Sequence, residues 1–319
     1  MNKHLISLAA TLALTTPVFA QNQTAPSPGE IVDRASQDEW VKIAAEDLVI
    51  MTLAPDSHGQ PREVMIQLIP KPFSQGWVKN IRTLARAGWY DDITINRVQD
   101  NYVVQWGDPN YDNPEAEGEA KPLPEGLRTI DEEDYTSPVT SIRKGEMPPE
   151  GHGMTRGDAY AAWTDLYKGW PIASDGKKDW PVHCYGMVGV GRGMSPDTGT
   201  GAELYTVIGH APRHLDRNIA LVGRIVEGME LLSSLPRGSG ALGFYTAEES
   251  SKRTPFMSVR IASDLPAGER PSFEYLSTEG ETFAEYADAR ANRRDPFFIT
   301  AAGGADICNI PVPVRRTAR

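Results

Sequence analysis

The chain has 319 residues, 40% of them hydrophobic, and a formal net charge of −11 at pH 7. This length and hydrophobic content are sufficient for one large domain, or two ordinary ones, with a buried core. The acidic charge argues against a nucleic-acid partner, because phosphate binding requires a basic surface. The 25 prolines and 29 glycines favour many turns and long connections over a helical bundle.

The first twenty residues have the pattern of a secretory signal peptide. Lys3 supplies a positive start, residues 5–14 form an apolar run, and residues 18–20 have the usual cleavage spacing. The run is too short to span a bilayer, and the chain has no other long apolar stretch. We therefore expect a mature protein in the periplasm or outside the cell, without a membrane span. It would begin with a leader at 21–45, whose polar part at 21–39 is expected to be flexible.

The first predicted elements after this leader are a hairpin and a helix. The β-prone stretches 47–53 and 63–68 flank a turn-rich connection, which predicts two antiparallel strands. Apolar residues at three- and four-residue spacing predict an amphipathic helix over 72–87, ended by Gly88. Further strands are predicted at 93–97, 102–105, 185–191, 204–208, 220–226 and 255–262.

Two regions differ from this pattern of short strands. Residues 110–183 are rich in proline, glycine and acidic residues, with one predicted helix over 158–168. The acidic run at 131–134 lacks calcium-loop spacing and is interpreted as a solvated loop. Residues 265–319 are predicted to form an appendage with one helix over 279–291. Many short strands without βαβ alternation favour an antiparallel barrel or sandwich.

The common catalytic and metal-binding motifs are absent from the sequence. The glycine-rich residues 189–193 lack the third glycine of a dinucleotide-binding loop, and there is no HExxH or GxSxG motif. Ser174 and Lys177 match a serine–lysine pattern without its companion motifs, so a hydrolase is only a remote alternative. Cys184 and Cys308 lack zinc-ligand spacing, and the sequence leaves open whether they pair in an oxidising compartment. We expect neither a metal nor a cofactor.

Two segments carry a more specific pattern. They read WYDDITINRV at 89–98 with YVVQWGDP at 102–109, and ELYTVIG at 203–209 with HLD at 214–216 and VGRIVEGM at 222–229. The first resembles the cyclophilin pattern Y-D-G-x-x-F-H-R-V followed by F-M-x-Q-G-G-D-P. The second resembles the S-Q-F-F-I, L-D and F-G-x-V-x-x-G-M series of that family, and YGMVGVGR at 185–192 stands where the family has G-x-x-x-M-A-R. The blocks agree in order and spacing.

The resemblance covers most of residues 46–264. It implies a cyclophilin-like domain over that range, with an insertion at about 110–183 and a C-terminal extension at 265–319. The implied fold is mainly β, a closed antiparallel β-barrel with capping helices. The implied activity is cis/trans isomerisation of X-Pro bonds in proline-containing polypeptides, without a cofactor.

The resemblance also implies site residues. It gives Arg97 the catalytic role, since a fixed guanidinium can donate a hydrogen bond to the imide nitrogen that becomes basic in the transition state. Gln105 corresponds to the glutamine that binds the substrate backbone. The other substrate-binding positions that it implies are Tyr102, Val103, Gly191, Glu203, Tyr205, His214 and Leu215.

Several positions depart from the family pattern while Arg97 and Gln105 are kept. A histidine, a glycine, a glutamine and a phenylalanine of the family are replaced by Asn96, Trp106, Glu203 and Tyr205. This combination fits an isomerase with an unusual preference, or a non-catalytic peptide- or protein-binding module. An ionised carboxylate only accepts hydrogen bonds, so Glu203 is expected to influence the preference for charged residues near the proline.

Overall fold

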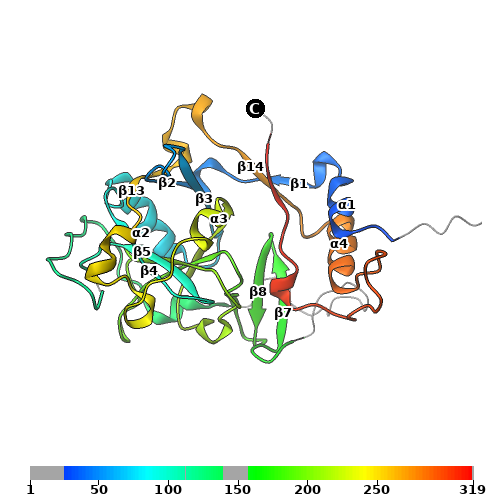
Figure 1. Ribbon diagram of the computed structural model, residues 1–319. Helices are drawn as coiled ribbons and strands as arrows, with labels where there is room; N and C mark the ends of the chain where they lie inside the picture. The colour runs from blue at the N-terminus through cyan, green and yellow to red at the C-terminus, as the bar shows by residue number, and fades with distance from the viewer. Residues whose placement is uncertain (1–24, 112, 139–156, 318–319) are drawn as a thin grey trace, which may run out of the picture.

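Eight strands form the largest sheet of the protein, and each pairs with its neighbours in antiparallel fashion (Figure 1). The computed structural model describes residues 25–111, 113–138 and 157–317. In spatial order the strands are β13 (Phe256–Ile261), β2 (Leu48–Leu53), β3 (Arg62–Leu68), β12 (Leu221–Glu227), β10 (Met187–Val190), β11 (Leu204–Val207), β5 (Val103–Gly107) and β4 (Thr94–Val98). All eight strands were predicted from the sequence, with boundaries that differ by up to two residues.

The sheet curls into a nearly closed β-barrel. The main-chain N–H of Ile95 in β4 donates to the carbonyl of Thr254, just before β13. The N–H of Phe256 in β13 donates to the carbonyl of Ile93, just before β4. These bonds join the two edge strands, so few strand edges are left open to pair with another chain. The predicted antiparallel barrel is confirmed, and a sandwich is excluded.

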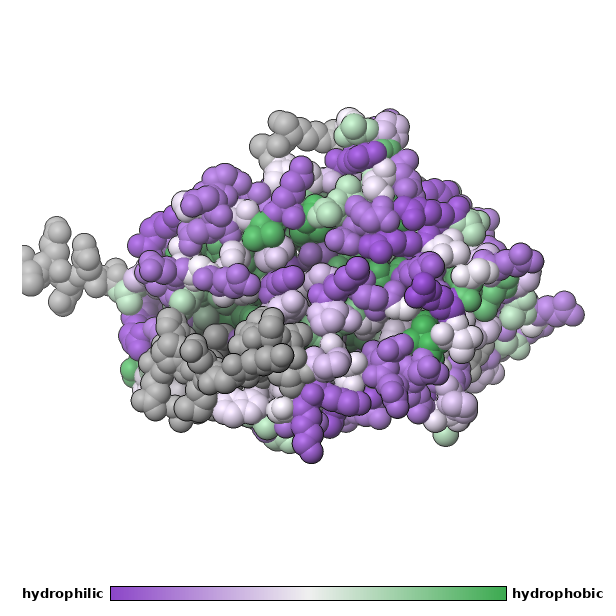
Figure 2. All heavy atoms as spheres, turned by 180° about the vertical axis from the view of Figure 1, so that it is seen from behind, coloured by the Kyte–Doolittle hydropathy of each residue, from purple (hydrophilic) through white to green (hydrophobic). Residues whose placement is uncertain are grey.

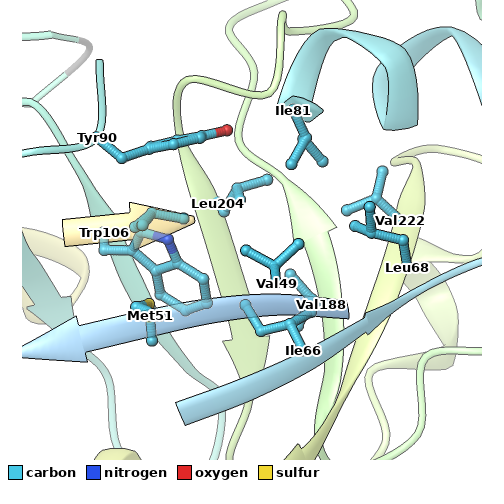
Figure 3. Close-up of a pocket in the computed structure, with 11 residues that line it drawn as sticks. Val49, Met51, Ile66, Leu68, Ile81, Tyr90, Trp106, Val188, Leu204 and Val222 are labelled. Atoms are coloured by element: carbon cyan, nitrogen blue, oxygen red, sulfur yellow. The ribbon is translucent and has the colours of Figure 1, made fainter. Parts of the chain in front are cut away.

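The interior of the barrel is filled by side chains, as Figure 3 shows. Alternate residues of β2 and β3 point inward, Val49 with Met51 and Ile66 with Leu68, and Ile81 extends from a helix above them. The lining consists of Val49, Met51, Ile66, Leu68, Ile81, Tyr90, Trp106, Val188, Leu204, Val222 and Val259, and the cavity between them measures about 10 Å³. This is about the space that one water molecule needs. The interior is therefore a packed core, and Trp106, which replaces a family glycine, belongs to it.

The helix α2 (Gln75–Arg86) covers one end of the barrel and confirms the helix predicted over 72–87. Its buried face includes Trp77, Ile81 and Leu84, which recur at the spacing of one helix side. The Trp77 indole N–H is satisfied by the carbonyls of Thr198 and Gly199, at 3.0 Å each. The chain leaves the helix through Gly88 at φ 64°, a conformation that glycine adopts most readily. A second, shorter helix, α3 (Met229–Ser233), follows β12.

A separate four-stranded sheet lies within the predicted insertion. Its order is β6 (Ser137–Pro138), β9 (Lys178–Pro181), β8 (Trp170–Ser174) and β7 (Trp163–Tyr167). The helix predicted over 158–168 is therefore wrong. Tyr167 pairs with Trp170 across a two-residue turn in which Lys168 and Gly169 both have positive φ, at 49° and 79°. Such a turn matches the twist of a hairpin, and it overrides the helix-like spacing of the apolar residues before it.

The chain before the barrel packs against the C-terminal extension. The helix α1 (Pro28–Asp33) contacts α4 (Glu281–Ala291), and the two lie side by side away from the barrel (Figure 1). A capping box between Ser27 and Glu30 starts α1. The strand β1 (Trp40–Lys42) pairs with β14 (Phe273–Leu276), which also pairs with β15 (Val314–Arg316). The prediction that residues 21–39 are flexible is therefore wrong from residue 25 onward, where the described part begins. The helix predicted over 279–291 is confirmed by α4.

A disulfide joins Cys184 to Cys308, which decides the pairing that the sequence left open. It links the C-terminal extension to the segment that leads into β10.

The predicted signal peptide at 1–20 lies outside the described residues. In the part of the chain that the structure describes, no helix has both the length and the apolar character needed to cross a bilayer. The face opposite to that of Figure 1 is mostly hydrophilic, with small separate apolar patches (Figure 2).

Candidate functional site

Strand pairing brings three of the predicted site residues into one row on the outside of the barrel. Arg97 of β4 lies opposite Gln105 of β5, and Gln105 lies opposite Tyr205 of β11. Directly opposed residues of neighbouring strands point to the same face of a sheet. Their neighbours in sequence, Trp106 and Leu204, point into the barrel core. The local alternation of the strands thus separates the row from the core.

A groove of about 600 Å³ runs along this row, a size typical of ligand sites. Seven predicted site residues line it, namely Arg97, Tyr102, Val103, Gln105, Gly191, Tyr205 and Leu215. The other lining residues are Asn110, Asn113, Pro114, Arg192, Ile219, Leu242 and Phe244. Segments that lie far apart in the sequence therefore build one site.

The guanidinium of Arg97 is held on several sides. Its Nε donates to the main-chain carbonyl of Leu242 at 2.7 Å, and its Nη1 donates to Gln105 Oε1 at 3.1 Å. Nη2 donates to Gln99 Oε1. The Arg97 carbon Cζ also lies 5.6 Å from the ring centre of Tyr102 and 5.4 Å from that of Phe244. Burial lowers the pKa of Arg97 from its usual value, although a guanidinium stays protonated in proteins.

Beside this cation the floor of the groove is apolar. Val103 and Tyr205 belong to one buried cluster, against which Tyr102 and Ile219 pack. Burial raises the pKa of Tyr205 well above its usual value, so the phenol keeps its proton. A fixed donor cation beside an apolar pocket can bind a compact apolar ring and donate a hydrogen bond to a basic atom next to it.

His214 lies at the edge of this arrangement and does not line the groove. Its ring stacks on that of Tyr102, with centres 6.3 Å apart and an angle of 8° between the planes. The side chain is exposed. His214 therefore contacts the site through Tyr102.

Glu203 is the other predicted site residue that the structure does not bring into the groove. It lies one residue before β11, on the same face as Tyr205, and its carboxylate covers Gly107. A Cβ on Gly107 would come within 1.8 Å of Glu203 Oε1. Only 4% of Glu203 is exposed, so its contact with a bound peptide would be indirect.

Two of the residues missed in the sequence, Leu242 and Phe244, come from the connection between α3 and β13. Arg97 forms an isolated β-bridge with Phe244, and Leu242 and Gly243 have φ values of 54° and 81°. The glycine-rich stretch around them signals a tight turn, but no local pattern shows that it folds back onto β4. The amide-bearing residues Asn110 and Asn113 were likewise absent from the predicted site.

The alternative chemistries find little support in the geometry. Ser174 Oγ donates to the carbonyl of Lys178 and accepts the N–H of Gly176, as a turn-forming serine does, and it lies outside the groove. Among the described residues, no group of three or more His, Cys, Asp or Glu side chains could hold a metal ion. The described lining residues include no serine, cysteine or lysine that could act as a nucleophile.

Comparison with protein families gives a match over residues 63–263. The matched family is described as cyclophilin type peptidyl-prolyl cis-trans isomerase/CLD. No curated protein sequence matches the chain significantly.

Solved structures also resemble the protein. The cyclophilin AquaCyp293 from Hirschia baltica matches with a TM-score of 0.59 and 20% sequence identity, covering 90% of this chain and 100% of its own. A cyclophilin type peptidyl-prolyl cis-trans isomerase from Cryptosporidium parvum, solved in the presence of the dipeptide ala-pro, matches with a TM-score of 0.36 and 12% identity. That match covers 67% of this chain and 97% of the other. At its level of identity, the similarity to the Hirschia baltica protein shows a shared fold.

Proposed function

Because this chain belongs to the cyclophilin-type peptidyl-prolyl cis-trans isomerase family, we propose that it isomerises X-Pro bonds of exported proteins with Arg97 as the catalytic residue. The observation that carries this proposal is the fixed guanidinium of Arg97 beside an apolar pocket. The two features match the two parts of an X-Pro imide, a basic nitrogen and a compact apolar ring.

The reaction requires rotation about an amide bond and no bond cleavage. Delocalisation of the nitrogen lone pair gives this bond a rotation barrier of about 18–20 kcal/mol. In the twisted transition state the lone pair is localised, and the nitrogen becomes a better hydrogen-bond acceptor. A donor that reaches this nitrogen therefore stabilises the transition state more than the ground state.

Arg97 is suited to be that donor. Three of its five N–H groups are used within the described part of the chain, by Leu242, Gln99 and Gln105. The other two lie on the Nη atoms and are available to a ligand. Since the held groups fix the plane of the guanidinium, little reorganisation is needed when the imide twists.

Gln105 can hold the substrate backbone at the same time. Its Oε1 accepts from Arg97, which leaves the amide NH₂ to donate to a peptide carbonyl. Val103, Tyr205 and Leu215 offer apolar surface for the proline ring. In this arrangement the ring is held while the preceding carbonyl rotates.

Two observations support action on exported proteins. The first twenty residues have the pattern of a secretory signal peptide. The disulfide between Cys184 and Cys308 is of a kind that persists in the periplasm and outside the cell and is rare in the cytosol. The proposed location is therefore the periplasm or the extracellular space.

A protease-coupled isomerisation assay on a set of X-Pro peptides tests the proposal. We expect Arg97→Ala to lower kcat/KM by about 10²–10³-fold, the usual cost of removing a transition-state donor. Arg270→Ala is the control, because Arg270 is exposed and its Nε also donates to a main-chain carbonyl, that of Leu265. If Arg97→Ala isomerises as fast as the parent, Arg97 is not catalytic. If the parent binds these peptides without isomerising them, the protein is a binding module.

A further inference from the structure

A buried polar network begins at the floor of the groove. The hydroxyl of Tyr205 lies 2.8 Å from Nε2 of His183, and Nδ1 of His183 lies 2.8 Å from Oδ1 of Asp216. The same carboxylate oxygen accepts the main-chain N–H of His183 at 3.1 Å. His183 is 0% exposed, and Tyr205 and Asp216 are each 4% exposed. A polar chain buried this deeply specifies one arrangement of its members, because each broken bond leaves a desolvated group.

The direction of the hydrogen bonds follows from the donor and acceptor groups. A carboxylate only accepts, so Nδ1 of His183 donates its proton to Asp216. In the neutral ring this leaves Nε2 as the acceptor for the hydroxyl of Tyr205. The second nitrogen of a histidine is commonly oriented by such a carboxylate.

The strand next to β11 provides space for this phenol. Gly189 of β10 lies directly opposite Tyr205 in the strand pairing. A Cβ at Gly189 would come within 2.3 Å of both Cζ and the hydroxyl oxygen of Tyr205. The phenol therefore lies in a space that a glycine leaves open, and its hydroxyl ends on the one ring nitrogen that can accept it.

Beyond Asp216 the network reaches two segments outside the barrel. Nε of Arg213 donates to Asp216 Oδ2 at 2.7 Å, and its Nη1 donates to Asp158 Oδ2 at 2.5 Å. Asp158 lies in the predicted insertion. Asp306, in the C-terminal extension, lies 4.0 Å from the same Nη1. His183 itself immediately precedes Cys184, which the disulfide joins to that extension.

We propose that His183 is a positioning residue for isomerisation, which fixes the phenol of Tyr205 and thereby sets the depth of the proline pocket. This inference rests on the proposed function. It assigns a role to a buried histidine that does not line the groove. It also gives the insertion and the extension a connection to the site, since both contact the network that holds Tyr205.

A double-mutant cycle tests the proposal, with His183→Leu, Tyr205→Phe and the double variant measured against the parent. We expect His183→Leu to lower kcat/KM by about 10-fold, because a displaced pocket wall misplaces the reacting groups. In the Tyr205→Phe background the same change should cost less than about 2-fold, since the hydroxyl that it serves is gone. His183→Gln, which keeps an acceptor near the position of Nε2, should recover most of the activity.

Thr206→Val is the matched control for a purely structural effect. Thr206 is also fully buried, lies next to Tyr205 on the opposite face of β11, and donates to the carbonyl of Met187 at 3.1 Å. This variant should be less stable in thermal unfolding but should isomerise at the parent rate. Losses from His183→Leu and Tyr205→Phe that multiply, or a His183→Leu variant as active as the parent, would overturn the proposal.

Two further measurements cover the cases in which His183→Leu does not fold or the parent is inactive. If His183→Leu does not fold, Gly189→Ala displaces the phenol without removing a polar partner, and an unchanged rate in that variant contradicts the proposal. If the parent does not isomerise any peptide, the proposed function fails. The cycle is then measured from the dissociation constants of an X-Pro peptide, and it must show the same non-additivity.

Discussion

At the scale of single residues, the orientation of the Arg97 guanidinium distinguishes it from an ordinary surface cation. Its three hydrogen bonds go to three different acceptors, and the rings of Tyr102 and Phe244 lie near its Cζ. A planar fork can meet several acceptors at once, whereas the ammonium of a lysine is a flexible point charge. The isomerisation rate should therefore depend on the geometry of this side chain as well as on its charge.

Arg97→Lys tests this point. The variant keeps the positive charge but cannot serve Leu242, Gln99 and Gln105 while also reaching the substrate. We expect kcat/KM to fall at least 10-fold, equivalent to about 1.4 kcal/mol of transition-state stabilisation. Steady-state isomerisation kinetics of the purified variant measure the loss. A rate equal to that of the parent would show that charge alone is sufficient.

Glu203 provides a second test at this scale. Because its carboxylate covers Gly107 and is almost buried, we expect Glu203→Gln to change the rate by the same factor for every peptide. Peptides that differ only in having Asp, Ala or Lys beside the X-Pro bond provide the measurement. A selective gain for acidic peptides in the variant would show that the carboxylate reaches the substrate after all, as the resemblance alone implies.

At the scale of elements, an ion pair connects the turn after α2 to the last barrel strand. Asp91 accepts two hydrogen bonds from Arg260 of β13, at 2.7 and 2.8 Å, and this lowers the pKa of the Asp91 carboxyl. The side chains of Asp91 and Arg260 are 28% and 42% exposed, so solvent screens the pair. Its contribution to the free energy of unfolding should be about 0.5–1 kcal/mol.

The pH dependence of this contribution has a definite sign. Since the pKa of Asp91 is lower in the folded state than in the unfolded state, the stabilisation is complete above about pH 4 and is lost as the pH falls through the lowered value. We expect Asp91→Asn to be less stable than the parent at pH 7 and the difference to shrink below pH 4. Urea unfolding of the variant and the parent at pH 7 and at a pH below 4 measures this difference in stability. The control is Asp92→Asn, at the exposed neighbouring residue. A difference that is the same at both pH values would contradict the assignment.

At the scale of the whole molecule, the disulfide and the sheet of β1, β14 and β15 hold the C-terminal extension against the rest of the chain. The bridge closes a loop with a sequence separation of 124. In the chain-entropy model, a loop of this size stabilises the folded state by at most about 5 kcal/mol. Pairing of β14 with β1 and packing of α4 on α1 act in the same direction, so part of the extension should stay in place without the bridge.

Replacing both cysteines by alanine should therefore lower the free energy of unfolding without abolishing folding. Guanidinium unfolding of the oxidised parent and of the Cys184→Ala/Cys308→Ala variant measures the difference. Dithiothreitol should destabilise the parent and leave the variant unchanged. Equal unfolding midpoints for the two proteins would mean that the bridge does not restrain the unfolded chain.

Local patterns in the sequence were enough to predict several elements of this protein. The spacing of Trp77, Ile81 and Leu84 defined α2, and β-prone runs between turns defined all eight barrel strands. The resemblance of the motifs in β4, β5 and β11 to the cyclophilin pattern also predicted Arg97, Gln105 and Tyr205 as site residues. Alternation along a strand predicts which of its residues share a face. The pairing of β5 with β11, which brings Tyr205 beside Gln105, joins segments that lie far apart in the sequence.

The distant segments that complete the site could be recognised only in the folded protein. Leu242 binds Arg97 across 145 residues, and His183 meets Tyr205 and Asp216 from a segment that lies outside the barrel strands. The hairpin of β7 and β8 depends on a two-residue turn that competes with helix-like spacing. The physical reason is the same in each case. Barrel closure and burial select these contacts among many that are locally equivalent, and no single stretch of sequence contains that choice.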